Sequence, residues 1–67
     1  NNIKPVGFVI GNKNLYLTNT DGKMIVVDLS LGNIKKVEKV SGNFISKPFI
    51  YNKRLFVIKE GSIIEYN

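Results

Sequence analysis

The sequence predicts an all-β fold of short antiparallel strands, arranged as blades of a β-propeller. Two observations support this prediction. Short apolar runs alternate with clusters of Gly, Asn and Asp along the whole chain, which is the pattern of strands and tight turns. The same series of strands and turns also occurs twice, about 40 residues apart, and a repeat of several short strands at that spacing is typical of propeller blades. We expect about one complete four-stranded blade plus three strands of a second, in a fragment of a larger propeller.

Length and composition limit the possible functions. A chain of 67 residues forms at most one small domain with a modest core. It contains no Cys and no His, so disulfides, thiolate metal sites and the most common general base are excluded. No apolar run approaches the roughly 18 residues that a membrane-spanning helix needs. The chain does not begin with Met, so we expect a processed piece or an expressed fragment.

The charge is strongly positive but dispersed. The chain has ten Lys and Arg residues and five Asp and Glu residues, which gives a net charge of +5. A basic balance can indicate binding to nucleic acid or to an anionic membrane surface. Because the cations are scattered along the chain rather than grouped in one block, solvated strand faces and protected sheet edges are the simpler interpretation.

The first three predicted strands form a meander. Pro5 can open a strand that runs to Ile10, because its missing N–H is harmless at a first strand position. Strands at 15–20 and 24–29 follow, and Asp21-Gly22 between them predicts a type I′ hairpin turn with positive φ at both residues. Both strands are apolar on both faces, so we expect them to be covered on both sides.

The next segment could be a strand or a short helix. A turn at 28–33 has Gly32 at its left-handed position. In the segment 34–41, apolar residues recur every third position, which also fits one face of a helix. The segment is short and its apolar residues are β-branched, so a polar outer strand is favoured. This strand would complete a first blade spanning residues 5–41.

After a turn at 41–43 the pattern begins again. Lys-Pro at 4–5 recurs at 47–48, NKNLYL at 12–17 recurs as NKRLFV at 52–57, and DGKMI at 21–25 recurs as EGSII at 60–64. The second unit, residues 45–67, has predicted strands at 46–51, 54–59 and 62–66 but nothing matching 34–41. We therefore expect it to be a partial blade.

This pattern resembles the PQQ-like repeat β-propeller family, whose blades run as a Pro-led strand, an apolar strand, Asp-Gly, an apolar strand ending in Asp, and a turn closing on Gly. The part from Gly22 onward is most similar to the C-terminal blades of the BamB-type lipoproteins of outer-membrane β-barrel assembly. The residues that carry this similarity are Asp28, Gly32, Val40-Ser41-Gly42, Phe44, Ser46, Pro48, Leu55, Val57 and Gly61-Ser62-Ile63. The chain departs from the family at Lys35-Lys36, where blades often carry a Trp.

The resemblance implies a non-enzymatic protein-interaction scaffold. Its parent protein would be periplasmic and anchored to the outer membrane, with protein partners in an assembly complex, no nucleic acid and no cofactor. In such rings a strand from the N-terminal end commonly closes the last blade. A fragment without that strand exposes sheet edges, so we expect self-association.

The residues suggest no catalytic, cofactor-binding or metal-binding site. Asp21 and Asp28 lie seven positions apart, each at a turn, but capping of turns is the usual role of such residues. The loop 19–22 offers too few oxygen ligands for calcium. The candidate residues are instead structural turn positions, namely Asp21, Gly22, Asp28, Gly32, Gly42, Pro48 and Gly61.

Two other functions stay open at this point. A small basic β-domain could bind single-stranded nucleic acid by stacking bases on aromatic rings beside lysines. The aromatic candidates are Tyr16, Phe44, Tyr51, Phe56 and Tyr66. A fragment of a quinone-dependent dehydrogenase is more remote, because the chain contains no Trp.

Overall fold

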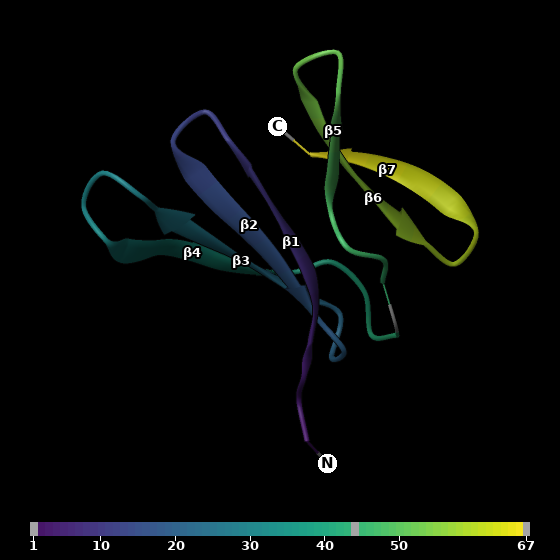
Figure 1. Ribbon diagram of the computed structural model, residues 1–67. Coiled ribbons are helices and arrows are strands. Elements are labelled where there is room, and N and C mark those ends of the chain that lie inside the picture. Colours follow the sequence, from purple (N-terminus) through teal and green to yellow (C-terminus); the bar gives the residue numbers. More distant parts are fainter. Residues whose placement is uncertain (1, 44, 67) are drawn as a thin grey trace.

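The computed structural model describes residues 2–43 and 45–66, and in that part of the chain it has seven strands and no helix. The strands form two antiparallel sheets (Figure 1). Sheet A has the order β1-β2-β3-β4, and sheet B has the order β5-β6-β7. The strand bounds are β1 Pro5–Gly11, β2 Asn14–Asn19, β3 Lys23–Asp28, β4 Asn33–Lys39, β5 Phe49–Tyr51, β6 Arg54–Lys59 and β7 Ser62–Tyr66. The prediction of an all-β chain with four strands followed by three is confirmed.

The ambiguous segment is a strand. In β4, Val37 pairs with Ile25 and Ile34 pairs with Val27, so the β-branched residues continue the apolar rows of β3. Lys35 is an extra residue at a bulge in this pairing. Every residue of β4 except Glu38 is exposed, as expected for a polar outer strand.

The turn between β2 and β3 corrects the predicted type I′ hairpin. Only Gly22 has positive φ (80°), and the strands are joined by the three residues 20–22. The Gly22 N–H donates to the carbonyl of Asn19 at 3.1 Å, and the carboxylate of Asp21 accepts the N–H of Lys23 at 3.2 Å. Three-residue hairpin loops need one left-handed residue at their end, and glycine fills that position here.

Type I′ conformations occur at other places in the chain. Asn12 and Lys13 both have positive φ (52° and 65°), and so do Asn52 and Lys53 (55° and 63°), which lie 40 positions later. Each pair joins two strands directly, β1 to β2 and β5 to β6. The repeat in the sequence is therefore matched by a repeat in the backbone conformation. Glu60-Gly61 forms a third turn of this kind, with φ of 51° and 81°.

Strand pairing corrects the alignment of the two Lys-Pro pairs. Pro5 pairs with Asn19, and Ile45 pairs with Lys59, which lies 40 positions after Asn19. Ile45 therefore takes the place of Pro5 in the second unit, and Pro48 takes the place of Phe8.

The same region explains why β5 begins only at Phe49 rather than at residue 46. Pro48 has no N–H to donate to a ladder. The N–H of Ile58 is accepted by the side-chain Oγ of Ser46 at 2.9 Å. The carbonyl of Ser46 instead accepts the hydroxyl of Thr18 in sheet A at 2.9 Å. Residue 46 thus links the two sheets: its N–H donates to the carbonyl of Ile58 on β6 at 3.0 Å, while its carbonyl bonds to sheet A and not to β6.

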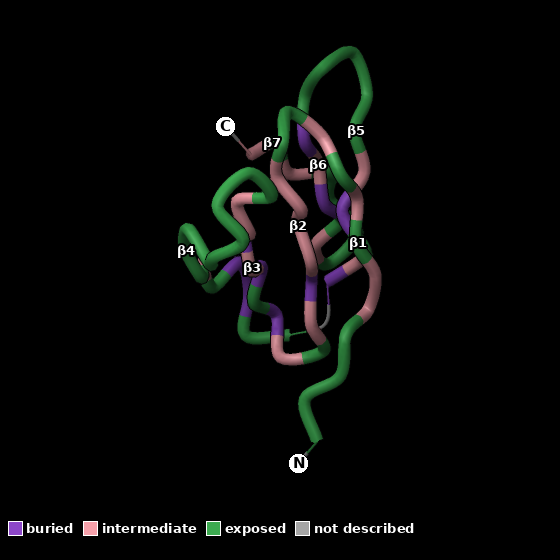
Figure 2. The backbone as a smooth tube through the Cα atoms, turned by 60° about the vertical axis from the view of Figure 1, so that its left-hand side comes forward, coloured by how far each residue is buried: buried purple, intermediate pink, exposed green. Residues whose placement is uncertain are grey.

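The two sheets share one core. Figure 2 shows buried residues on β3 and β6, whereas β4 is largely exposed. The sheets approach most closely where β1 contacts β5. A Cβ atom on Gly7 would lie 2.5 Å from the Cβ of Lys47, and one on Gly11 would overlap the side chain of Ile50, so glycine allows this approach. The core residues are Met24, Val26, Val40, Ile45, Leu55 and Val57.

Candidate functional site

The predicted turn residues hold the ends of the sheets. Gly22 is buried, and its carbonyl accepts the N–H groups of Val40 at 2.8 Å and Ser41 at 3.2 Å. A Cβ atom on Gly22 would overlap the carbonyl oxygen of Ser41. Gly22 therefore fixes the connection between the two sheets against the β2–β3 loop.

Asp28 shapes the turn at the other end of β3. Its Oδ1 accepts the N–H of Ser30 at 2.8 Å and of Leu31 at 3.0 Å, and its carbonyl accepts the N–H of Gly32 at 2.7 Å. Gly32 has φ of 74°, with no atom near the place of a Cβ. Asp21 precedes β3 and Asp28 is its last residue, so the two carboxylates lie at opposite ends of the strand and form no acid–base pair.

The remaining turn positions lie in or beside sheet B. Gly42 is exposed between Ser41 and Asn43, whose N–H is accepted by the Ser41 hydroxyl at 3.0 Å. The side-chain amide of Asn43 donates to Glu60 beside Gly61 at 2.9 Å. Pro48 is fully buried ahead of β5. The turn residues therefore have structural contacts and share no common site.

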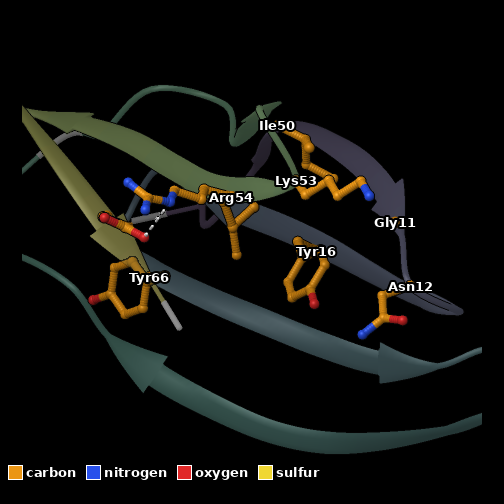
Figure 3. A pocket seen from close by; sticks show the side chains of 9 residues that line it. Gly11, Asn12, Tyr16, Ile50, Lys53, Arg54 and Tyr66 are labelled. Carbon is orange, nitrogen blue, oxygen red and sulfur yellow. Dashed lines mark ion pairs between the residues drawn. The ribbon is translucent and has the colours of Figure 1, made fainter.

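A cleft lies between the sheets. It consists of two adjoining cavities of about 620 and 360 Å³, both lined by Asn12, Tyr16, Leu55 and Tyr66. Figure 3 shows Tyr16 from β2 and Tyr66 from β7 lining the larger cavity, with Lys53 and Arg54 along its rim. Sequence reasoning missed this cleft because no local motif encodes it.

The cleft carries more positive than negative charge. Lys35 and Lys36 line the smaller cavity, and Lys53 and Arg54 line the larger one. Two of these cations have carboxylate partners. Lys36 Nζ lies 3.2 Å from Glu38 Oε1, and Arg54 Nε lies 3.7 Å from Glu65 Oε2.

One titratable group in the cleft is perturbed. Burial, together with the negative charge of the Glu38 carboxylate and a hydrogen bond to it, raises the pKa of Tyr66 above its ordinary value of 10.0. A tyrosine that stays neutral can hold a ligand by a hydrogen bond but does not act as a base. Within the described residues no group of three or more His, Cys, Asp or Glu side chains could hold a metal.

The aromatic candidates for base stacking lie in different places. Tyr16 and Tyr66 line the cleft, whereas Phe56 lies on the opposite face of sheet B. There it stacks on Phe49 with ring centroids 5.5 Å apart and an angle of 23° between the ring planes. Phe44 lies outside the described residues. The rings therefore form no single stacking platform.

A second candidate surface is the face of sheet A turned away from sheet B. Two rows of paired residues cross all four strands there, and each of the eight side chains is apolar. The residues that pair across a ladder lie on the same face. We call this surface the open face; its rows are Phe8–Leu17–Ile25–Val37 and Ile10–Leu15–Val27–Ile34.

Nothing in the described chain covers the open face. Phe8 is 59% exposed and Val37 is 54% exposed, although both belong to this continuous apolar surface. The expectation that β2 and β3 would be covered on both sides is met on one side only: Met24 and Val26 are buried against sheet B, whereas the open-face residues of these two strands are half-buried. Exposed apolar surfaces of this extent commonly mark interaction sites.

The two sheets pack front to back. Leu55 and Val57 on the face of sheet B that meets sheet A are equivalent, 40 positions later, to Leu15 and Leu17. Those two residues lie on the open face, away from sheet B. Sheet A meets sheet B with its opposite face, which carries Tyr16 on the same strand. Equivalent faces of the two repeats therefore point in the same direction.

No protein-family model, curated protein or solved structure matches this chain. In the described part of the chain, no helix has the length and apolar character needed to cross a membrane.

Proposed function

We propose that the chain is a non-enzymatic protein-interaction scaffold made of two adjacent units of a PQQ-like repeat β-propeller. By its resemblance to the BamB-type lipoproteins, its parent protein would be periplasmic, outer-membrane anchored, and part of an outer-membrane assembly complex. In this proposal the open face receives a neighbouring protein sheet. Fold resemblance alone does not establish a function, and it is the surfaces of the chain that support this one.

The front-to-back packing carries this proposal. When two repeats pack with different faces in contact, one kind of face stays free at one end of the stack and the other kind at the other end. Further units can therefore be added at either end in the same orientation. A sandwich in which equivalent faces meet would bury both apolar faces and leave none for a neighbour. The eight apolar residues of the open face are what a further unit would bury.

The reading frame that encodes the chain tests this proposal. We expect further units with the same strand–turn pattern at a spacing of about 40 residues. A photoreactive residue in place of Val37 in the full-length protein should cross-link to a strand of such a unit or of a protein partner. The same residue in place of Leu31, in the β3–β4 turn, is the matched control. A frame without further units, combined with no cross-link from position 37, would contradict the proposal.

The cationic cleft supports a second candidate function, the binding of single-stranded nucleic acid. Lys35, Lys36, Lys53 and Arg54 gather around two tyrosines there. We rank this function lower because Lys36 and Arg54 already have carboxylate partners. A gel-shift titration decides between the two, since phosphate contacts make such binding weaken steeply with added salt.

A further inference from the structure

We propose that a second copy of this chain covers the open face, using the outward face of its sheet B, so that copies associate head to tail. This inference rests on the proposed function and extends it to the 67-residue chain by itself, in which a second copy takes the place of a further unit on the open face. We call the outward surface of sheet B the back face; its apolar residues are Phe49, Tyr51, Phe56, Ile58 and Ile63.

Each chain carries both halves of an interface that it already forms. Within one chain, the face bearing Leu55 and Val57 packs on the face bearing Tyr16 and Met24. The open face, which bears Leu15 and Leu17, is the repeat equivalent of the face bearing Leu55 and Val57. The back face is the equivalent of the second, because Phe56 lies 40 positions after Tyr16 and Ile63 lies 39 positions after Met24. The open face and the back face therefore correspond, residue by residue, to the two faces that already pack together within one chain.

Strand pairing supports this equivalence independently of the sequence alignment. Tyr16 pairs with Val9 on β1, and Phe56 pairs with Phe49 at the corresponding place on β5. Thr18 pairs with Met24, and Ile58 pairs with Ile63. In each case, the side chains on the back face are at least as apolar as their counterparts in the core. This surface is thus suited to cover apolar residues.

The back face is bulkier or more charged than its counterpart at four positions. Lys47, Tyr51 and Arg54 take the places of Gly7, Gly11 and Asn14, and Glu65 takes the place of Val26. Tyr51 is 69% exposed, so its ring has room to turn aside. Glu65 is paired with Arg54 and adds no net charge to the surface.

Electrostatics gives the association a distinct salt dependence. Each copy carries a net charge of +5, so two copies repel each other, while the faces that meet are apolar. Added salt screens the repulsion without weakening the apolar contact. Association should therefore strengthen as salt is raised, which is the opposite of the behaviour of nucleic-acid binding.

The experiment measures molar mass by light scattering as a function of concentration, for the chain and two double variants. The open-face variant is Phe8→Lys with Val37→Lys, and the back-face variant is Tyr51→Lys with Ile63→Lys. All four positions are exposed, so the fold should persist, and far-UV circular dichroism checks this. The control is Ser30→Lys with Leu31→Lys, which adds the same charge in the exposed β3–β4 turn.

The head-to-tail arrangement makes a specific prediction for mixtures. Each face variant alone should remain at the mass of one chain, because each lacks one of the two faces. An equimolar mixture of the two should form a heterodimer of twice that mass and grow no further. The control should associate like the unmodified chain.

Three results would overturn the inference. One is an unmodified chain that stays monomeric at millimolar concentration. Another is self-association of either face variant to the same extent as the unmodified chain, which would mean that equivalent faces meet. The third is failure of the mixed variants to pair. None of these results depends on the reading-frame test, so the proposed function and the head-to-tail inference can fail separately.

Discussion

At the scale of single residues, Gly22 is the most constrained of the six glycines. Its φ is positive, and the place of its Cβ is occupied by the carbonyl oxygen of Ser41. An alanine there would meet both backbone strain and a steric overlap with backbone that a side chain cannot relieve. Gly42 has open space around it and no positive φ.

Gly22→Ala should therefore destabilise the fold by more than the roughly 1–3 kcal/mol that left-handed strain alone costs. Gly42→Ala is the matched control and should change the free energy of unfolding by less than about 0.5 kcal/mol. Urea titration followed by circular dichroism measures both values. Equal stability of the two variants would contradict the role assigned to Gly22.

A substitution at Gly32 measures backbone strain without the steric overlap that is present at Gly22. It has positive φ, but nothing lies near its Cβ position. Gly32→Val should cost roughly 1–3 kcal/mol through left-handed strain alone. Thermal unfolding checks this, and a variant that melts no earlier than the parent chain would show that the turn after Asp28 does not need its left-handed residue.

Tyr66 and Glu38 connect sheet B to the outer strand of sheet A. Because burial and the Glu38 charge raise the pKa of Tyr66 in the folded chain, its contribution to stability is fully present below the unfolded pKa near 10.0. That contribution is lost as pH rises through the folded pKa. Stability should therefore fall above pH 10.

Glu38→Gln should lower the pKa of Tyr66 toward its ordinary value, because the negative charge beside the hydroxyl is removed. Tyrosinate absorbance during a pH titration measures this, and the difference from Tyr66→Phe isolates the signal of this residue. Glu60→Gln, in the β6–β7 turn, is the control and should leave the Tyr66 titration unchanged. An unchanged titration in Glu38→Gln would contradict the assigned cause.

At the scale of elements, the hairpins show what could be predicted from the sequence. The strands are bounded by Gly, Asn and Asp, and the apolar runs between them define their positions, so most strands lie where predicted. The backbone conformation of the turns could not be predicted as well. Asp21-Gly22 has the favoured composition of a type I′ turn and is not one, while Asn12-Lys13 is one although lysine rarely adopts positive φ.

The sequence also did not predict that β5 is short or which faces of the two sheets pack together. The β5 ladder is interrupted because the Ser46 carbonyl turns to Thr18, a contact that exists only once the sheets have met. The packing direction is hidden because β2 is apolar on both faces, so either Leu15 or Tyr16 could have faced the partner sheet. Such choices depend on tertiary contacts rather than on local pattern.

The two strained lysine turns lead to a prediction about whole hairpins. Lys13→Gly and Lys53→Gly should each stabilise the chain by about 1 kcal/mol, because glycine adopts positive φ without steric cost and Asn-Gly is the preferred type I′ pair. Lys23→Gly, at an exposed position in β3, should instead destabilise it by roughly 0.5–1 kcal/mol. Urea unfolding compares the three variants. Destabilisation by both turn substitutions would contradict the assigned turn conformations.

At the scale of the whole molecule, the single core makes the two sheets interdependent. Sheet A contributes Met24 and Val26 to that core, and sheet B contributes Leu55 and Val57. Ile45 lies fully buried among them, in the connection that bridges to β6. Neither sheet buries its inner face without the other, so we expect the chain to unfold as one unit.

Ile45→Ala tests this interdependence. Truncation of a fully buried Ile leaves a cavity and should cost roughly 2–5 kcal/mol. A domain of this length has a total stability of roughly 3–10 kcal/mol, so the loss should be evident in every part of the fold. Hydrogen exchange should show equal loss of protection in β2 and β3 of sheet A and in β6 of sheet B. Leu31→Ala, at a position 74% exposed, is the control and should change neither sheet. Loss of protection confined to sheet B would show that sheet A is stable by itself, and the shared core would then not be what holds the two units together.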